Sequence, residues 1–316
     1  RNEQMKKIIQ RAGILFVVFL AALVVYFIGA HRTSEQEGAV YSSMDESRLP
    51  VVYTEFEGKE INGLHGYVQD MGNRAAGEAI SVLSSDRRLN LRIHEFGNTI
   101  TEISYEIRNL SMDRLIERTE LSDWSSKEGI TTVSLPIQNL ISKDKAYLLI
   151  LNVKTAEQQI QYYTRIMWTD APRALDMLQL AEEFTRKSLD YEQAKELVSY
   201  LETSPEEDNS SLGHVTIRAS FDHLTWDGLH AEMEGEPRIT LQEFDGIMGQ
   251  GSGSILCPAY RFRRERRVLA EAEDNFAMKW NEQRIYLMNY ERNANHIFTG
   301  SEGAFFRKED CFGNFR

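Results

Sequence analysis

The chain has 316 residues, of which 42% are hydrophobic and 27% charged, and its formal net charge is −12. This length allows about two domains besides a targeting segment, and the apolar content is enough to fill ordinary cores. The excess of acids repels phosphate backbones, so nucleic acid is not an expected partner. Two cysteines, Cys257 and Cys311, are too few for a disulfide-rich scaffold.

The N-terminus contains an apolar run without charge, from Ala12 to Ala30, that is long enough to cross a bilayer as one helix. Residues 1–11 carry four bases and one acid, and by the positive-inside rule this tail is cytoplasmic. The sequence therefore predicts a membrane anchor with the bulk of the chain outside the cytoplasm. A cleaved signal peptide is the alternative, but the run is longer than a usual signal core.

The part beyond the anchor is strongly acidic. Removing the tail's net charge of +3 from the total of −12 leaves about −15 for the rest. Residues 31–48 are rich in Ser, Glu and Gly without sustained periodicity, which is typical of a solvated linker.

Residues 49–168 show short runs with the two-residue period of strands. In the last run Ile160, Tyr162 and Thr164 share one face. Two runs, 89–93 and 103–107, flank Gly97-Asn98 and predict a hairpin. About eight such strands at the spacing of antiparallel turns predict an immunoglobulin-like β-sandwich. The runs are 49–56, 61–68, 89–93, 103–107, 115–121, 130–135, 147–153 and 160–168.

At Asp170 the period changes to that of a helix, and residues 169–208 predict an αα-hairpin followed by an acidic linker. Asp170 can cap the first helix, whose first turn accepts Pro172. Asp190 and Gln193 resemble a capping box for a second helix that stops before Pro205. The apolar stripe of that second helix is Ala194, Leu197, Val198 and Leu201.

Residues 209–300 predict a second β-rich region, so that the fold class is mainly β with an α-helical insert. Strand alternation recurs at 215–221, 229–233 and 239–244. The runs 276–280 and 284–290 predict a hairpin around Asn281-Glu282, and residues 301–316 read as an irregular tail.

Residues 250–274 interrupt this pattern. They contain Gly251-Ser252-Gly253-Ser254 and then a basic stretch from Tyr260 to Arg267. An exposed basic loop, a partner-binding patch and a protease-sensitive linker are three interpretations. A frameshift here and over 301–316 is a fourth, because the tail, back-translated with chosen codons and read one nucleotide later, gives a strand-like sequence. On that hypothesis the authentic protein continues past Arg316.

The candidate chemistry is sparse. The densest group of possible metal ligands lacks the helical spacing or paired cysteines of a zinc motif, so solvent-facing histidines are the favoured interpretation. No Gly-x-Ser-x-Gly elbow or Walker motif is present. No catalytic, cofactor-binding or metal-binding residue is therefore assigned. The group consists of His214, His223, His230, Asp222 and Asp227.

Two further groups have a structural and a functional interpretation. The acids Glu182-Glu183 and Glu206-Glu207-Asp208 fit a solvated helix face and a linker. Seven aromatic residues could line a carbohydrate or peptide groove, but their strand spacing favours cores and cross-strand pairs. These are Tyr162, Tyr163, Trp168, Trp226, Trp280, Tyr286 and Tyr290.

The anchor, the alternating strands and the segments MLQLAEEFTRKSLDYEQAKELVSYLE and MKWNEQRIYLMNYERNANHIF together resemble uncharacterised single-pass membrane proteins of Gram-positive bacteria. In that family the outer part begins with β-rich domains and can continue into a propeller-like region. The resemblance covers residues 1–250 and 275–300. It implies a location at the cell membrane and transfers no catalytic residue.

We therefore expect a membrane-anchored, non-catalytic protein of the cell envelope that binds, scaffolds or senses a peptide, a glycan or an envelope protein. An anchored cell-envelope hydrolase acting on glycan or peptide is the alternative. A sensor would have to signal through helix contacts within the bilayer, because its cytoplasmic tail is so short.

Overall fold

The computed structural model describes residues 15–23, 49–72, 79–83, 85–137, 139, 141–169, 173–207, 209, 211–226, 231–262 and 269–297. The chain divides into two compact units, Arg1–Asp45 and Glu46–Arg316. In the first unit residues 15–23 are helical with exposed side chains. Over the described ranges, none of the helices is both long and apolar enough to cross a membrane. The remainder of the predicted span Ala12–Ala30 lies outside the described residues.

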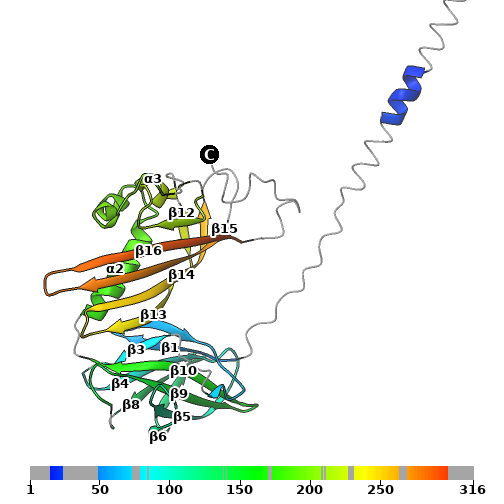
Figure 1. Cartoon of the computed structure of the whole chain (residues 1–316). Helices are drawn as coiled ribbons and strands as arrows, with labels where there is room; N and C mark the ends of the chain where they lie inside the picture. The colour runs from blue at the N-terminus through cyan, green and yellow to red at the C-terminus, as the bar shows by residue number, and fades with distance from the viewer. Residues whose placement is uncertain are drawn as a thin grey trace, which may run out of the picture. The chain divides into compact units, whose positions relative to one another are not determined.

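The second unit is mainly β, and its first part consists of two five-stranded sheets (Figure 1). Strand β3 runs parallel to β10, whereas the other pairs in these sheets are antiparallel. The first sheet has the order β2 (Lys59–Leu64), β1 (Val51–Phe56), β4 (Arg88–His94), β8 (Ile130–Pro136) and β7 (Trp124–Lys127). The second has the order β3 (Ile80–Leu83), β10 (Gln159–Trp168), β9 (Ala146–Thr155), β5 (Ile100–Arg108) and β6 (Leu115–Leu121).

The hairpin predicted around Gly97-Asn98 is wrong, because β4 and β5 belong to different sheets. Leu91 of β4 and Tyr105 of β5 are buried in the same hydrophobic cluster, so the two strands face each other across a shared core. Alternation indicates that a strand has one buried face. It does not say whether the next strand pairs with it or crosses to the opposite sheet.

The predicted face of β10 is confirmed, since Ile160, Tyr162 and Thr164 are all buried. In the described part of the first region, two strands escaped prediction. Strand β3 is short and buried along its whole length, and β7 is a polar edge strand, so neither shows the two-residue period.

The helical insert differs from the prediction in its second half. The first helix, α2 (Arg173–Lys187), is regular, and the proposed cap Asp170 lies outside the described residues. The second segment, η2 (Gln193–Tyr200), is a 3₁₀ helix. Its three-residue period buries Ala194 and Leu197 and leaves Val198 exposed, which breaks the stripe expected of an α-helix. The αα-hairpin is therefore one α-helix followed by a 3₁₀ turn.

The second β region is an antiparallel six-stranded sheet that α2 crosses (Figure 1). The predicted β15–β16 hairpin is confirmed, and its strands are longer than expected. The expected strand 215–221 ends at Thr216, where the backbone turns and the N–H of Ala219 donates to the Thr216 carbonyl oxygen at 3.1 Å. The short helix α3 (Phe221–Leu224), capped by Ser220, follows. The strand order is β11 (His214–Thr216), β16 (Ile285–His296), β15 (Leu269–Trp280), β14 (Gln250–Phe262) and β12 (Ala231–Glu234), with β13 (Arg238–Asp245) also paired to β14.

The described part of residues 250–274 is strand and not loop. In β14 the side chains of Cys257 and Tyr260 are buried, and Arg261 pairs with Glu234 of β12. The glycines of β14 let its backbone lie close to the backbone of β13, because a Cβ on Gly253 would lie only 2.5 Å from a backbone oxygen of β13. The alternation of apolar residues gives no sign of this contact. Residues 263–268 and 298–316 lie outside the described residues, and the frameshift hypothesis stays a prediction.

The two β regions are joined by a continuous hydrophobic core. Ile61 and Ile80 of the first region belong to the same buried cluster as Phe184 of α2 and Phe276 of β15. The wholly buried Asn62 links them further. It donates to the carbonyl oxygen of Ile80 at 2.9 Å and accepts from the backbone N–H of Leu241 in β13 at 2.8 Å. Residues 46–316 are accordingly one compact unit.

Candidate functional site

A cleft of about 440 Å³ opens where the two β regions meet, and we call it the junction cleft. One wall comes from strands of the first region and the other from α2 and the segment that leads into β13. Clefts between domains are common positions for ligand sites. Its lining consists of Tyr53, Lys59, Glu60, His94, Glu182, Glu236, Pro237, Arg238 and Ile239.

An ion pair between Lys59 and Glu182 crosses this junction, with Nζ 2.6 Å from Oε2. Arg186, one helical turn beyond Glu182, donates to its other carboxylate oxygen at 3.2 Å. Burial raises the pKa of Glu182, but the hydrogen bonds and charges of Lys59 and Arg186 outweigh that effect and hold it below its ordinary value. Glu182 is therefore ionised at neutral pH.

A second charged group lies on the wall formed by the first region. Glu60 of β2 pairs with Nε of Arg92 at 2.7 Å and with Nε2 of His94 at 3.3 Å, both from β4. The imidazole of His94 also meets the ring of Tyr53 edge to face, with ring centroids 5.0 Å apart. These contacts orient an aromatic ring and a carboxylate toward the same cleft.

The residues lining the junction cleft are suited to binding. Lys59, Glu60 and Arg238 are partly or fully exposed and present charges of both signs. Among the residues that the structure describes, no Ser, Thr or Cys that could act as a nucleophile lines the cleft. Within the described ranges, no three His, Cys, Asp or Glu side chains gather to hold a metal ion.

A different charged group is buried in the core of the second region. Arg292 of β16 is 0% exposed and Asp274 of β15 is 1% exposed. Arg292 donates to the Asp274 carboxylate at 2.7 and 3.0 Å and to Oγ of Ser188 at 2.6 Å, and its guanidinium lies 5.0 Å from the ring of Trp226. Thr185 of α2 donates to the same carboxylate at 2.7 Å. The group ties α2 to the sheet and is closed to solvent.

The histidine group suggested by the sequence does not assemble among the described residues. His214 is exposed on the edge strand β11, where Nδ1 lies 2.9 Å from the side-chain oxygen of Asn293. His223 is buried in α3, and its Nε2 lies 3.3 Å from the carbonyl oxygen of His214. Asp222 is also in α3, while Asp227 and His230 lie outside the described residues.

Of the two acidic groups, one contributes to the junction cleft. Glu182 lines it, whereas its neighbour Glu183 is exposed beside Lys187. The sequence predicts that Glu182 and Glu183 both lie on a solvated helix face, and for Glu182 this prediction is wrong. In the other group Glu207 accepts a hydrogen bond from Thr216 at 2.7 Å, and Asp208 lies outside the described residues.

The aromatic residues named from the sequence do not line the cleft. Tyr162, Trp226 and Tyr290 are buried in the hydrophobic cores, and Trp280 stacks on Phe244 with centroids 5.3 Å apart. The first wall consists of Tyr53, Lys59, Glu60 and His94, and no sequence motif marks these residues. Alternation could place them on the outward face of their strands, but nothing in the sequence brings those strands to α2.

Comparison with protein-family models finds no match, and comparison with curated proteins also finds none. A solved structure that is similar is that of an engineered protein, determined at 1.98 Å. It is 10% identical with a TM-score of 0.22, and the alignment covers 29% of this chain. The chain spans 18% of the length of that protein, and the likeness carries no argument about fold or function.

Proposed function

We propose that this protein is a membrane-tethered, extracytoplasmic binding protein of the cell envelope, and that its ligand is a short peptide held in the junction cleft. The proposal is carried by one observation: both walls of the junction cleft present charges, and together these charges are of both signs. The shared hydrophobic core keeps the two walls in place. A ligand with both an ammonium and a carboxylate meets complementary groups there, whereas a ligand of one sign also meets like charges.

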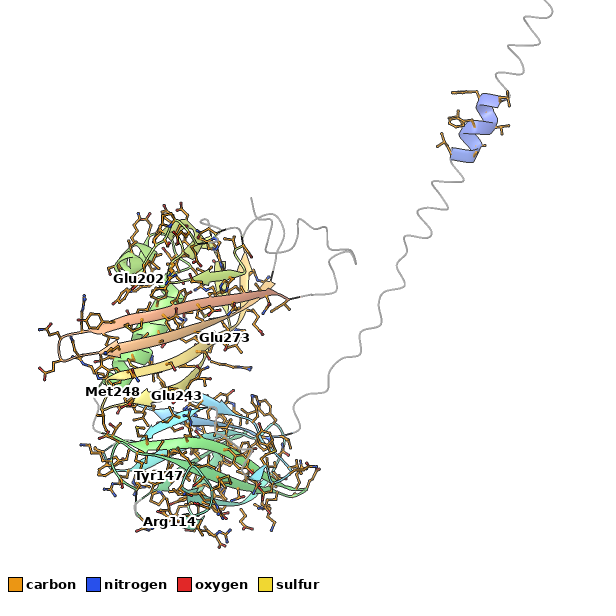
Figure 2. The ribbon with its side chains drawn as sticks, viewed as in Figure 1. Arg114, Tyr147, Glu202, Glu243, Met248 and Glu273 are labelled. Atoms are coloured by element: carbon orange, nitrogen blue, oxygen red, sulfur yellow. The ribbon has the colours of Figure 1, made fainter. Side chains whose placement is uncertain are left out.

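The fixed geometry of the walls supports binding further. Asn62 and the Lys59–Glu182 pair join the regions, and Arg165 of β10 reaches Glu243 of β13 at 2.9 Å; Glu243 is labelled at this boundary in Figure 2. A cleft whose walls are already ordered loses little conformational entropy when a ligand enters.

The location rests on the sequence. Ala12–Ala30 is the proposed anchor, with residues 1–11 in the cytoplasm and the rest outside. Residues 49–168 are proposed to be an immunoglobulin-like sandwich. The order β1-β4-β8-β7 follows A-B-E-D and the order β10-β9-β5 follows G-F-C of that fold.

Binding is tested by titrating the full-length protein, in nanodiscs, with the tripeptide Ala-Glu-Lys, which carries charges of both signs. Acetyl-Ala-Lys-amide and acetyl-Ala-Glu-amide are the single-charge comparisons. The proposal predicts that the tripeptide binds more tightly than either, and that Lys59→Met weakens it about tenfold, as expected for one lost hydrogen bond to a charged group.

Lys127→Met is the matched control, because Lys127 is exposed at the end of the edge strand β7 and pairs with the equally exposed Glu128 that follows it. Equal affinity for all three peptides, or equal losses in the two lysine variants, would contradict the cleft as the site. Cleavage of the tripeptide during the titration would support the anchored hydrolase instead.

The anchor is tested on cells that express the full chain. We expect the protein to stay in the membrane fraction after carbonate extraction and to be digested by protease added to cells stripped of their wall. Release by carbonate, or full protection from the protease, would contradict the proposed topology.

A further inference from the structure

The outer face of the second sheet of the first region carries a polar groove of about 500 Å³, separate from the junction cleft. We call it the sheet groove. Polar side chains from β5, β9 and β10 form its floor, including Ser104, Asn152 and Gln161. Gln161 donates to the side-chain oxygen of Asn152 at 3.0 Å and accepts from the Tyr163 hydroxyl at 2.7 Å. The amides are thus oriented by their neighbours.

A carboxylate held by two arginines occupies one side of the sheet groove. Glu106 is nine-tenths buried and accepts from Nε of Arg108 at 2.9 Å and from Nε of Arg118 at 2.8 Å. Burial raises the pKa of Glu106, but the hydrogen bonds and charges of the two arginines outweigh this and keep it ionised. Asp70 and Glu120 also line the groove, so its two arginines stand against three acids and no large excess of either charge remains.

An apolar cluster borders the polar groups. Leu148, Ile150 and Tyr163 are buried together on the same outer face, and Met71 and Met112 pack against them. Ile150 and Met112 also line the sheet groove. A ligand that fits must therefore present hydroxyls to one part and an apolar ring face to the other.

We infer that the sheet groove binds a neutral oligosaccharide. Vicinal hydroxyls both donate and accept, which matches the amide, carboxylate and guanidinium edges gathered here. The carbon-bearing face of a pyranose ring can cover Met112, which is partly exposed beside the buried Ile150. This site is distinct from the proposed peptide site in the junction cleft and does not depend on it.

The test is calorimetric titration of the full chain in nanodiscs with chitotetraose, cellotetraose and xylotetraose, without sugar-based detergents that would compete. At least one of these neutral probes should bind. Gln159→Ala and Asn152→Ala, which each remove one amide from the groove, should weaken that binding about tenfold, the value of one hydrogen bond.

Two controls keep the result interpretable. Glu102→Gln changes an exposed residue on the same strand as Glu106, paired with Lys154 outside the groove, and should leave glycan binding unchanged. Lys59→Met should do the same, which separates this site from the junction cleft. Three results would each overturn the inference. The first is that no neutral probe binds with a Kd of about 1 mM or lower. The others are equal losses of binding in all variants and a preference for hexalysine or hexaglutamate over the neutral probes.

Discussion

Replacing Asp274 by Asn tests whether the second region has the dry, ordered core described here. The substitution keeps the size of the side chain but removes the negative charge that faces Arg292. Arg292 is wholly buried and makes two of its hydrogen bonds to Asp274. The Ser188 hydroxyl and the Trp226 ring are its neighbours, but neither carries a charge that could replace the carboxylate.

The magnitude follows from the burial of both partners. Removing one member of a buried ion pair costs about 3–5 kcal/mol, because the other charge is left without compensation. With a urea m-value of about 3 kcal/mol/M, the unfolding midpoint of Asp274→Asn should fall by about 1–1.7 M. The double variant Asp274→Leu with Arg292→Met removes both charges and should recover most of that loss.

The assay is urea unfolding of the full chain, followed by circular dichroism and by tryptophan fluorescence. Glu102→Gln is the matched control, because the Glu102–Lys154 pair is more than half exposed and should contribute at most about 1 kcal/mol. A loss below about 1 kcal/mol in Asp274→Asn, or additive losses in the double variant, would refute the buried pair and the packing of α2 over it.

Three further predictions concern the second region, the junction and its pH dependence. Burial raises the pKa of the Cys257 thiol to about 11 and shields it from reagents. In a Cys311→Ser background, iodoacetamide should therefore label Cys257 only after the protein unfolds. Rapid labelling of the folded protein would show that β14 is not a core strand. Asn62→Ala leaves the Ile80 carbonyl and the Leu241 N–H without their partner and should cost about 3 kcal/mol in urea unfolding, with an unchanged midpoint contradicting the junction. The pKa of Glu182 is lower in the folded than in the unfolded protein, so its contribution to folding stability is present above the unfolded pKa of about 4.3 and is lost as pH falls through the folded pKa. The stability difference between wild type and Glu182→Gln should therefore shrink below pH 5. A difference that does not change with pH would contradict the ion pair.

Much of the β architecture can be predicted from the sequence, because a strand with one buried face shows its period directly. The buried face of β10 and the β15–β16 hairpin follow from that rule. Pairing does not follow, as β4 and β5 show, because a strand that faces a core looks the same in either sheet. The sequence also does not show which glycines allow two backbones to lie close together, as Gly253 in β14 does against β13.

The candidate site is harder to predict for a related reason. Lys59, Glu60 and His94 come from two strands, while Glu182 comes from a helix that begins well after both strands in the sequence. No motif joins them, because α2 is positioned against the first region by tertiary contacts, which include the shared core and the Lys59–Glu182 pair. Charged residues that lie on separate elements have no fixed separation in the sequence, so no motif can identify them as one site.

The junction cleft is the ligand site on which the proposed function rests. Hydrogen exchange, measured by mass spectrometry on the full chain in nanodiscs with and without saturating Ala-Glu-Lys, tests it directly. We predict increased protection in the peptides that contain residues 53–60, 92–94, 182–186 and 236–239, because these ranges include the residues that line the junction cleft. Protection confined to other strands, or none under conditions where the tripeptide binds, would contradict the junction cleft as the site of binding.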